Sequence, residues 1–182
     1  MIEKNDEGYI LHLFLKERNI SMTVKSFSTH GYNSIGVGCI VTKIENGTNY
    51  YLVGQKRGRT VVWCMPGGHV EPGESFIEAG IRESKEECGL TEFNDIKLLA
   101  LFHTTNSLGS VAISILMKMT YTGTKAPSLT EPNKFLQWKW LSEDMLLTLL
   151  DDEKIWLSIA KSSLKYYFYQ QIEPNVEIHR FK

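Results

Sequence analysis

The residues best suited to do chemistry in this chain are three glutamates that lie within five positions of one another. On a helix, Glu83, Glu86 and Glu87 would be neighbours on one side, because residues three and four positions apart lie above one another. Carboxylates this close repel one another unless a positive charge lies among them. Mg²⁺ takes oxygen ligands of this kind and often shares them with substrate phosphates. The spacing therefore predicts a divalent-cation site, and a solvated acidic helix face is the alternative.

A turn and a helix must position these glutamates. The segment 71–74 reads Glu-Pro-Gly-Glu, and proline second with glycine third predicts a type II turn. Ser75 followed by Glu78 is a capping-box sequence, and Gly89 is typical of a helix end. The sequence thus predicts a helix between Ser75 and Gly89. Its inner face is expected to carry four residues at helical spacing: Ile77, Ile81, Ser84 and Cys88.

An arginine and two glycines complete this stretch. Arg82 lies on the predicted helix and can pair with Glu74, back in the turn, through a charge-assisted hydrogen bond. This pair would fix the turn against the helix. Gly67 and Gly68 precede the turn and let the backbone come close to a metal ion or a phosphate.

Residues 66–90 as a whole, PGGHVEPGESFIEAGIRESKEECGL, resemble the Nudix box, G-x5-E-x7-R-E-U-x-E-E-x-G-U, where U is a bulky apolar residue. Ser84 departs from the first U position, which concerns packing more than chemistry. The matching positions are Gly68, Glu74, Arg82, Glu83, Glu86, Glu87, Gly89 and Leu90. The resemblance covers roughly residues 34–150. It implies an α/β fold, an α/β/α sandwich with a mixed central sheet.

The resemblance also implies an activity and its residues. Nudix enzymes hydrolyse a nucleoside diphosphate linked to another moiety, with Mg²⁺ as the expected cofactor and Mn²⁺ as a possible substitute. The implied metal ligands are Glu83, Glu86 and Glu87, together with the Gly68 carbonyl, or that of the preceding glycine. The implied catalytic group is Glu86, Glu87 and Arg82. Either Glu86 or Glu87 could act as the base, because family members differ in this respect.

The segments around the box predict strands and candidate substrate contacts. Residues 34–43 and 50–55 are typical of strands, and Asn46-Gly47 between them is a strong hairpin signal. Lys56 and Arg57 follow the second strand and could bind polyphosphate oxygens, with an exposed basic hairpin end as the alternative.

Downstream of the box, residues 96–102 and 111–121 predict two further strands. Thr105 and Asn106 lie between them, where related enzymes often line the nucleoside pocket, although a turn role suits Asn106 equally well. A short strand then carries Trp138 and Trp140 on one face. Trp138 could stack on a base, and core packing is the alternative. Two amphipathic helices follow, one capped by Ser142 and one over residues 155–169.

The substrate indicated by the resemblance is a nucleoside triphosphate, possibly an oxidised guanine nucleotide, cleaved to the monophosphate and pyrophosphate. The stretches WxxPGGHVEPGES and EPNKFxxWxWLSxDxL carry this indication. The alternatives are a Nudix hydrolase of capped RNA, a dinucleoside polyphosphate or a nucleotide sugar, and a non-catalytic nucleotide-sensing module. The sensing module is disfavoured because such modules usually lose glutamates of the box.

Length and composition place these features in one domain. We expect residues 29–182 to form a single Nudix hydrolase domain with C-terminal helices, and residues 1–28 to be an extension of unclear role, helical or extended. A net charge of −1 gives no long-range attraction for nucleic acid, so no stable nucleic-acid partner is expected. The odd count of three cysteines and the absence of a membrane-length apolar run favour a cytoplasmic protein. Residues 1–28 could cover the sheet or mediate contacts in a homodimer.

Overall fold

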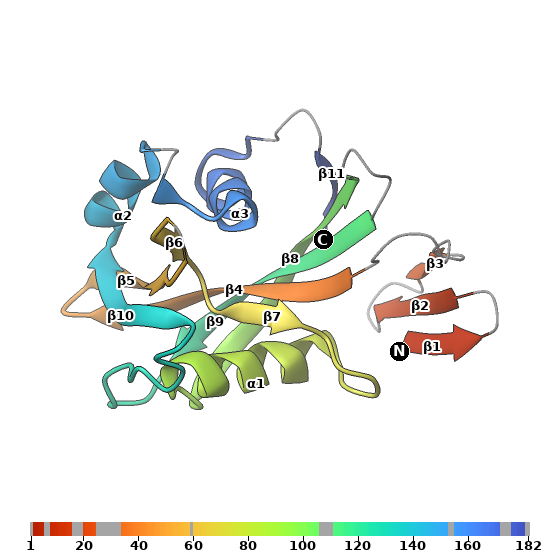
Figure 1. Ribbon diagram of the computed structural model, residues 1–182, viewed down its shortest axis with the longest axis horizontal. Coiled ribbons are helices and arrows are strands. Elements are labelled where there is room, and N and C mark those ends of the chain that lie inside the picture. Colours follow the sequence, from red (N-terminus) through yellow and green to blue (C-terminus); the bar gives the residue numbers. More distant parts are fainter. Residues whose placement is uncertain are drawn as a thin grey trace.

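A mixed β-sheet with helices on both faces forms the centre of the computed structural model (Figure 1). The structure describes residues 2–5, 8–15, 20–24, 34–58, 60–105, 111–152, 155–171 and 176–180. Within these residues the sheet has the strand order β10-β5-β4-β9-β8-β11, with β6 and β7 pairing beside β5 and β4. The strands of this sheet are β4 (Ser34–Glu45), β5 (Thr48–Lys56), β6 (Val62–Cys64), β7 (Gly67–His69), β8 (Phe93–Thr105), β9 (Val111–Tyr121), β10 (Phe135–Ser142) and β11 (Val176–Arg180).

The sheet is mixed because β4 and β9 run parallel while the other pairs are antiparallel. Strands β4 and β5 form the predicted hairpin, and both turn residues, Asn46 and Gly47, have positive φ, of 51° and 78°. That backbone is the reason why Asn-Gly is favoured at two-residue hairpin turns. The predicted α/β class with a mixed sheet is therefore confirmed.

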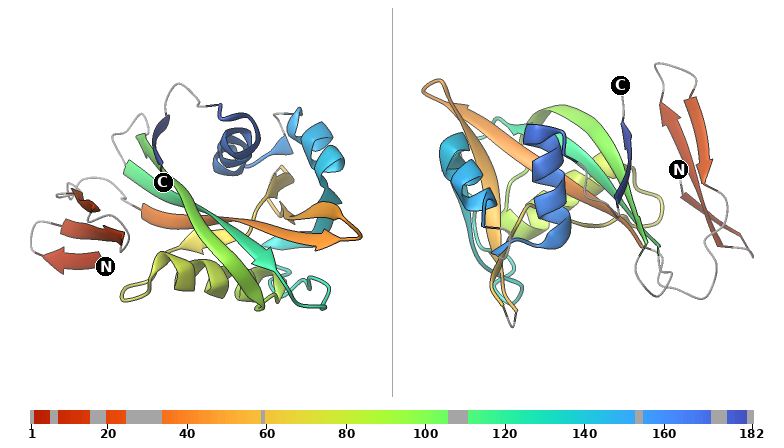
Figure 2. Two further views of the ribbon diagram at one scale, coloured as in Figure 1. Left: turned by 180° about the vertical axis from the view of Figure 1, so that it is seen from behind. Right: turned by 90° about the horizontal axis from the view of Figure 1, so that it is seen from above.

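Side-chain alternation along the strands divides the core into two layers (Figure 2). Helix α1 (Phe76–Cys88) covers one face, where Cys39, Ile115 and Met117 are buried. Helices α2 (Glu143–Leu150) and α3 (Ser158–Tyr169) cover the other face, where Ile40, Leu116 and Leu164 are buried. The three cysteines are buried and free, as expected for small apolar residues.

Two helix predictions need correction. Ile77 was expected on the inner face of α1, but its side chain is 38% exposed, and Ala79 and Gly80 take the buried positions instead. Gly80 is required there because a methyl group at this position would meet the sulfurs of Met117 and Cys39. The last helix begins at Ser158 rather than at residue 155, because Trp156 bridges to Trp63 in extended form first.

Two segments left open by the sequence are strands. The tail strand β11 pairs antiparallel with β8 and had no predicted structure. Near the N-terminus, β1 (Ile2–Asn5), β2 (Gly8–Leu15) and β3 (Ile20–Val24) form an antiparallel sheet of their own, which agrees with the extended alternative for this region. No helix in the described part of the chain is long and apolar enough to span a membrane.

Candidate active site

The predicted turn and capped helix are present. Gly73 has φ of 90°, as the third position of a type II turn requires, and the Glu74 N–H donates to the Glu71 carbonyl at 3.3 Å. At the start of α1, the Ser75 hydroxyl accepts from the Glu78 N–H, and the Glu78 carboxylate accepts from the Ser75 N–H. Gly89 ends the helix in the left-handed conformation, with φ of 72°.

Arg82 ties the turn, strand β7 and helix α1 together. Its Nε and Nη2 donate to the two carboxylate oxygens of Glu74, at 3.0 and 2.7 Å, which is the predicted pair in bidentate form. Nη2 also donates to the His69 carbonyl at 2.8 Å. Nη1 donates to Glu83 at 2.8 Å and to Glu86 at 3.2 Å. The guanidinium therefore holds the turn in place and neutralises part of the acidic cluster.

The three glutamates of the cluster have different surroundings. Glu86 is about half exposed, whereas the side chain of Glu83 is 13% exposed. Glu83 lies directly against Gly68, where any Cβ would overlap the carboxylate. Glu87 is buried and accepts a hydrogen bond from the Gly67 N–H at 3.0 Å. Burial, reinforced by the neighbouring charge of Glu83, raises the pKa of Glu87 to about 8 although Gly67 opposes the shift.

This donor set fits a hard divalent cation. All the candidate ligands offer oxygen, and the neighbouring negative charges that raise the pKa of Glu87 are those that a cation would offset. Among the described residues, no three histidine, cysteine or acidic side chains are already gathered in a metal-binding arrangement. Glu83 and Glu86 instead share the Arg82 guanidinium. A cation would therefore be bound as these side chains turn away from Nη1.

A fourth carboxylate, Glu131, lies in a loop that contacts the end of α1, and the sequence analysis did not single it out. Its charge contributes to the raised pKa of Glu87. It lies in the loop between β9 and β10, which runs beside one end of α1 in Figure 1. Thr130 donates its hydroxyl to the Glu86 carbonyl, and the Ser128 N–H donates to the Cys88 carbonyl at 2.9 Å. Glu131 is identified only by the contact of its loop with the end of α1, because its sequence context predicts a loop and nothing more.

Of the predicted phosphate contacts, Lys56 and Arg57 lie at the end of β5 and are exposed. The positive charge of Lys56 is close enough to Glu87 to oppose part of the rise in the pKa of that carboxyl. Arg57 is held against the β9–β10 loop, because its Nε donates to the Pro132 carbonyl at 3.2 Å. Lys56 therefore lies near Glu87, and Arg57 lies against the loop that also carries Glu131.

The predicted nucleoside contacts are described only in part. The Trp138 ring lies over Gly54, 4.8 Å from the Phe135 ring between centroids, and is 7% exposed. Core packing, the alternative given above, describes this position, and stacking on a base stays a prediction. Trp140 shares its face and stacks on Tyr121 instead. Thr105 ends β8, but its side chain, like the whole of Asn106, lies outside the described part of the structure.

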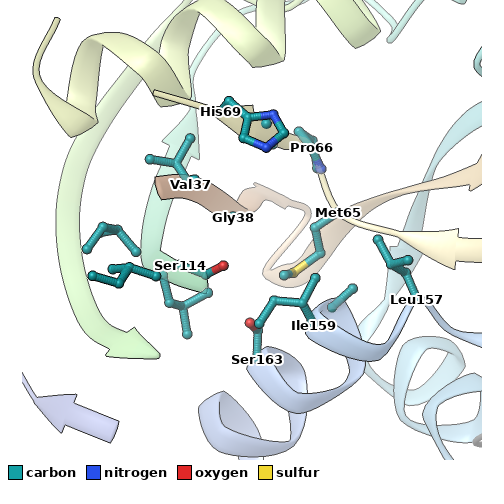
Figure 3. A pocket seen from close by; sticks show the side chains of 16 residues that line it. Val37, Gly38, Met65, Pro66, His69, Ser114, Leu157, Ile159 and Ser163 are labelled. Carbon is teal, nitrogen blue, oxygen red and sulfur yellow. The ribbon is translucent and has the colours of Figure 1, made fainter. Parts of the chain in front are cut away.

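A pocket of about 250 Å³ lies on the α3 face, beside the glycines of the box (Figure 3). Its floor includes Gly38, which lacks a side chain, and Ser114. Met65 also lines the pocket, and Ile159 and Ser163 of α3 close one side of it. Gly67 and Gly68 line the pocket as well, so it adjoins the acidic cluster. The sequence analysis missed it because strand periodicity does not reveal which helix covers a glycine.

Comparisons with known proteins agree with this geometry. A family model described as NUDIX domain matches residues 33–161. The asymmetrical bis(5'-nucleosyl)-tetraphosphatase of Mus musculus is 37% identical over 51 residues, which are 28% of this chain and 35% of that protein. A putative 8-oxo-dGTP diphosphatase of Bacillus subtilis is 42% identical over 52 residues, 29% of this chain and 34% of that protein. The matched stretches thus span about a third of these relatives.

A solved structure extends the similarity to the whole fold. The NUDIX hydrolase from Nitrosomonas europaea superposes with a TM-score of 0.60 at 22% identity, covering 78% of this chain and 93% of that chain. Sequence identity at this level shows that the two proteins share a fold and does not show a shared function. The family model spans most of the chain and includes the turn, the capped helix and the acidic cluster described above. The chain therefore belongs to the Nudix family.

Proposed function

We propose that the protein hydrolyses a phosphoanhydride bond of nucleotide derivatives with a divalent cation, Mg²⁺ or Mn²⁺, held by Glu83, Glu86 and Glu87. The observation that carries this proposal is the burial of the Glu87 carboxylate against the Gly67 N–H, beside Glu83. A buried carboxylate among other carboxylates is unfavourable unless a cation or a proton compensates it. A divalent cation there would stabilise the negative charge of the phosphates during hydrolysis.

The chain's own residues have separate tasks in this proposal. Arg82 keeps the turn and β7 fixed against α1, so that the Gly67 and Gly68 backbone stays beside the carboxylates. Glu87 is oriented by the Gly67 N–H, and Glu86 projects towards solvent, where water can reach it. Either can take the proton of the attacking water, as the new P–O bond forms and the bridging P–O bond breaks.

We propose nucleoside triphosphates as the substrates, including oxidised guanine nucleotides, cleaved to a nucleoside monophosphate and pyrophosphate. The similarity to a putative 8-oxo-dGTP diphosphatase of Bacillus subtilis supports this choice. The pocket beside Gly67 and Gly68 is mostly apolar, with three polar side chains, Ser114, Ser163 and His69, a lining that suits a base. Lys56 and Arg57 would meet the phosphates on the other side of the glycines.

A dinucleoside polyphosphate is the second candidate, because 37% identity over 51 residues links the chain to an asymmetrical bis(5'-nucleosyl)-tetraphosphatase. Both candidates carry at least three linked phosphates and need the same cation site. They differ in whether a second nucleoside must be accommodated beyond the phosphates.

A screen of product release separates these possibilities. The purified protein with Mg²⁺ would be offered (d)NTPs, 8-oxo-dGTP, diadenosine polyphosphates, ADP-ribose, a nucleotide sugar and capped RNA. We expect the highest kcat/KM with a triphosphate. A higher kcat/KM with diadenosine polyphosphate would select the second candidate. Binding of nucleotides without turnover of any of them would identify a sensing module and contradict the proposed hydrolysis.

A further inference from the structure

The turn that precedes β10 is built against the end of β5. The Lys134 and Phe135 N–H groups both donate to the Glu131 carbonyl, at 3.0 Å, which closes the turn. The Lys134 carbonyl accepts from the Arg57 N–H at 2.7 Å. These backbone bonds place Lys134 beside the end of β5, where Lys56 lies opposite Phe135, although the two lysines are far apart in sequence.

Lys134 lies beside the loop that contacts the end of α1, because Thr130, the neighbour of its partner Glu131, donates its hydroxyl to the Glu86 carbonyl. The Lys134 Nζ pairs with the Glu131 carboxylate at 2.7 Å, and the lysine side chain is 61% exposed. This hydrogen bond, followed by the charges of Glu87 and Glu83, raises the pKa of Lys134, so the ammonium stays charged. An exposed pair of this kind contributes little to stability. The ammonium can therefore exchange the Glu131 carboxylate for a phosphate oxygen with little loss of stability.

The order of features across the site suggests which phosphate this would be. The pocket on the α3 face is lined by Gly67 and Gly68. These glycines contact Glu87 and Glu83 on their other side, and Lys134 pairs with Glu131 in the loop that contacts the end of α1 at Glu86. A nucleotide with its base in the pocket would thus lay its phosphates along this line. Its terminal phosphate would come closest to Lys134.

We propose that Lys134 is a further substrate-binding residue, which contacts the terminal phosphate and favours substrates with three or more linked phosphates over diphosphate compounds. The inference rests on the proposed function and sharpens its substrate class. The plain alternative is a surface ion pair with no ligand.

The chain offers a matched control for that alternative. Lys97 is also 61% exposed and pairs with a carboxylate, Asp95, at 2.8 Å. It lies in β8, and its partner is not part of the acidic cluster. Lys134→Ala and Lys97→Ala therefore remove the same charge and an equivalent pair, but only the first removes a cation that pairs with Glu131 in the loop contacting the end of α1.

The test compares binding of α,β-methylene nucleoside triphosphate and diphosphate, analogues that block the proposed cleavage, by calorimetry in excess Mg²⁺. We expect Lys134→Ala to weaken triphosphate binding about fivefold and diphosphate binding less than about twofold. The fivefold loss corresponds to one partly exposed charge-assisted hydrogen bond to the terminal phosphate. Lys134→Arg should keep most of the affinity, and Lys97→Ala all of it. With a cleavable triphosphate, Lys134→Ala should raise KM more than it lowers kcat.

Two results would overturn the inference. One is triphosphate binding by Lys134→Ala that equals binding by Lys97→Ala, and the other is an equal loss for both analogues. The proposed function would survive either, since the parent protein would still hydrolyse triphosphates. If the parent protein bound triphosphate but turned over no nucleotide, the proposed hydrolysis would fail, and the binding comparison would still decide the role of Lys134.

Discussion

At the scale of single residues, the carboxylate of Glu87 is the least expected feature of the site. Sequence spacing groups it with Glu83 and Glu86, yet the three differ sharply in exposure. Helical periodicity placed all three on one side of α1, and that was correct. It could not show that α1 turns Glu87 towards the Gly67 backbone, because this depends on how the helix docks on β7.

Replacing Glu87 tests whether this carboxylate carries the chemistry. We expect Glu87→Gln to lower kcat by about 100-fold or more, because the amide removes one negative charge from the cation site. The glutamine oxygen can still accept from the Gly67 N–H, so circular dichroism and the unfolding midpoint should show an intact fold. Glu78→Gln is the control on the same helix, since glutamine also serves in a capping box. If Glu87→Gln turned over substrate at the parent rate, Glu87 would not be part of the catalytic site.

At the scale of elements, helix α1 is held at both ends by other segments. The Arg82–Glu74 pair fixes the turn at its start, and Thr130 and Ser128 bind carbonyl groups near its end. The first contact could be predicted because the turn, the cap and the arginine lie within a dozen residues. The second could not, because loop residues forty positions downstream carry no periodic signal. Ile77 was misplaced for a related reason, since the close approach of the sheet at Gly80 rotates the buried face.

The Arg82–Glu74 pair predicts how stability depends on pH. Its hydrogen bonds hold the pKa of Glu74 below the ordinary value of 4.5. The pair therefore stabilises the fold fully above that value, and this contribution is lost as pH falls through the lower pKa of the folded state. At about pH 7 we expect Glu74→Gln to lower the free energy of unfolding by about 1–2 kcal/mol.

Urea unfolding of parent and variant at several pH values measures this contribution. The difference in free energy of unfolding should shrink as the pH falls below about 4, because protonation removes the pair from the parent protein as well. If the difference in free energy of unfolding stays constant down to about pH 3, the pair does not lower the pKa of Glu74 in the folded state relative to the unfolded state.

At the scale of the whole molecule, the sheet and the helices on its two faces position the turn at Glu71–Glu74 and helix α1, which carries the acidic cluster. The sequence predicted the central strands and the helices well, because their apolar residues alternate or recur at helical spacing. It did not predict β11, because the alternation in Val-Glu-Ile-His-Arg covers only five residues, nor did it predict the pocket. Both depend on neighbours that are distant in sequence.

Cation binding should be visible as a change in global stability. A ligand that binds only the folded state at about 100 times its Kd adds about 2.7 kcal/mol, which for a chain of this size raises Tm by about 5 °C or more. We expect Mg²⁺ or Mn²⁺ to produce such a shift in the parent protein and in Glu78→Gln, and EDTA to reverse it. The shift should be much smaller in Glu83→Gln. Equal shifts in both variants would place the cation elsewhere.

The contact between the β9–β10 loop and the end of α1 joins two parts of the site that come from separate segments of the chain. The helix carries the carboxylates proposed to bind the cation, while Glu131 and Lys134 lie in a turn whose neighbour Thr130 bonds to the Glu86 carbonyl. Exchanging this turn would therefore leave the acidic helix unaltered, and we expect such exchanges to change which phosphate compounds the protein accepts.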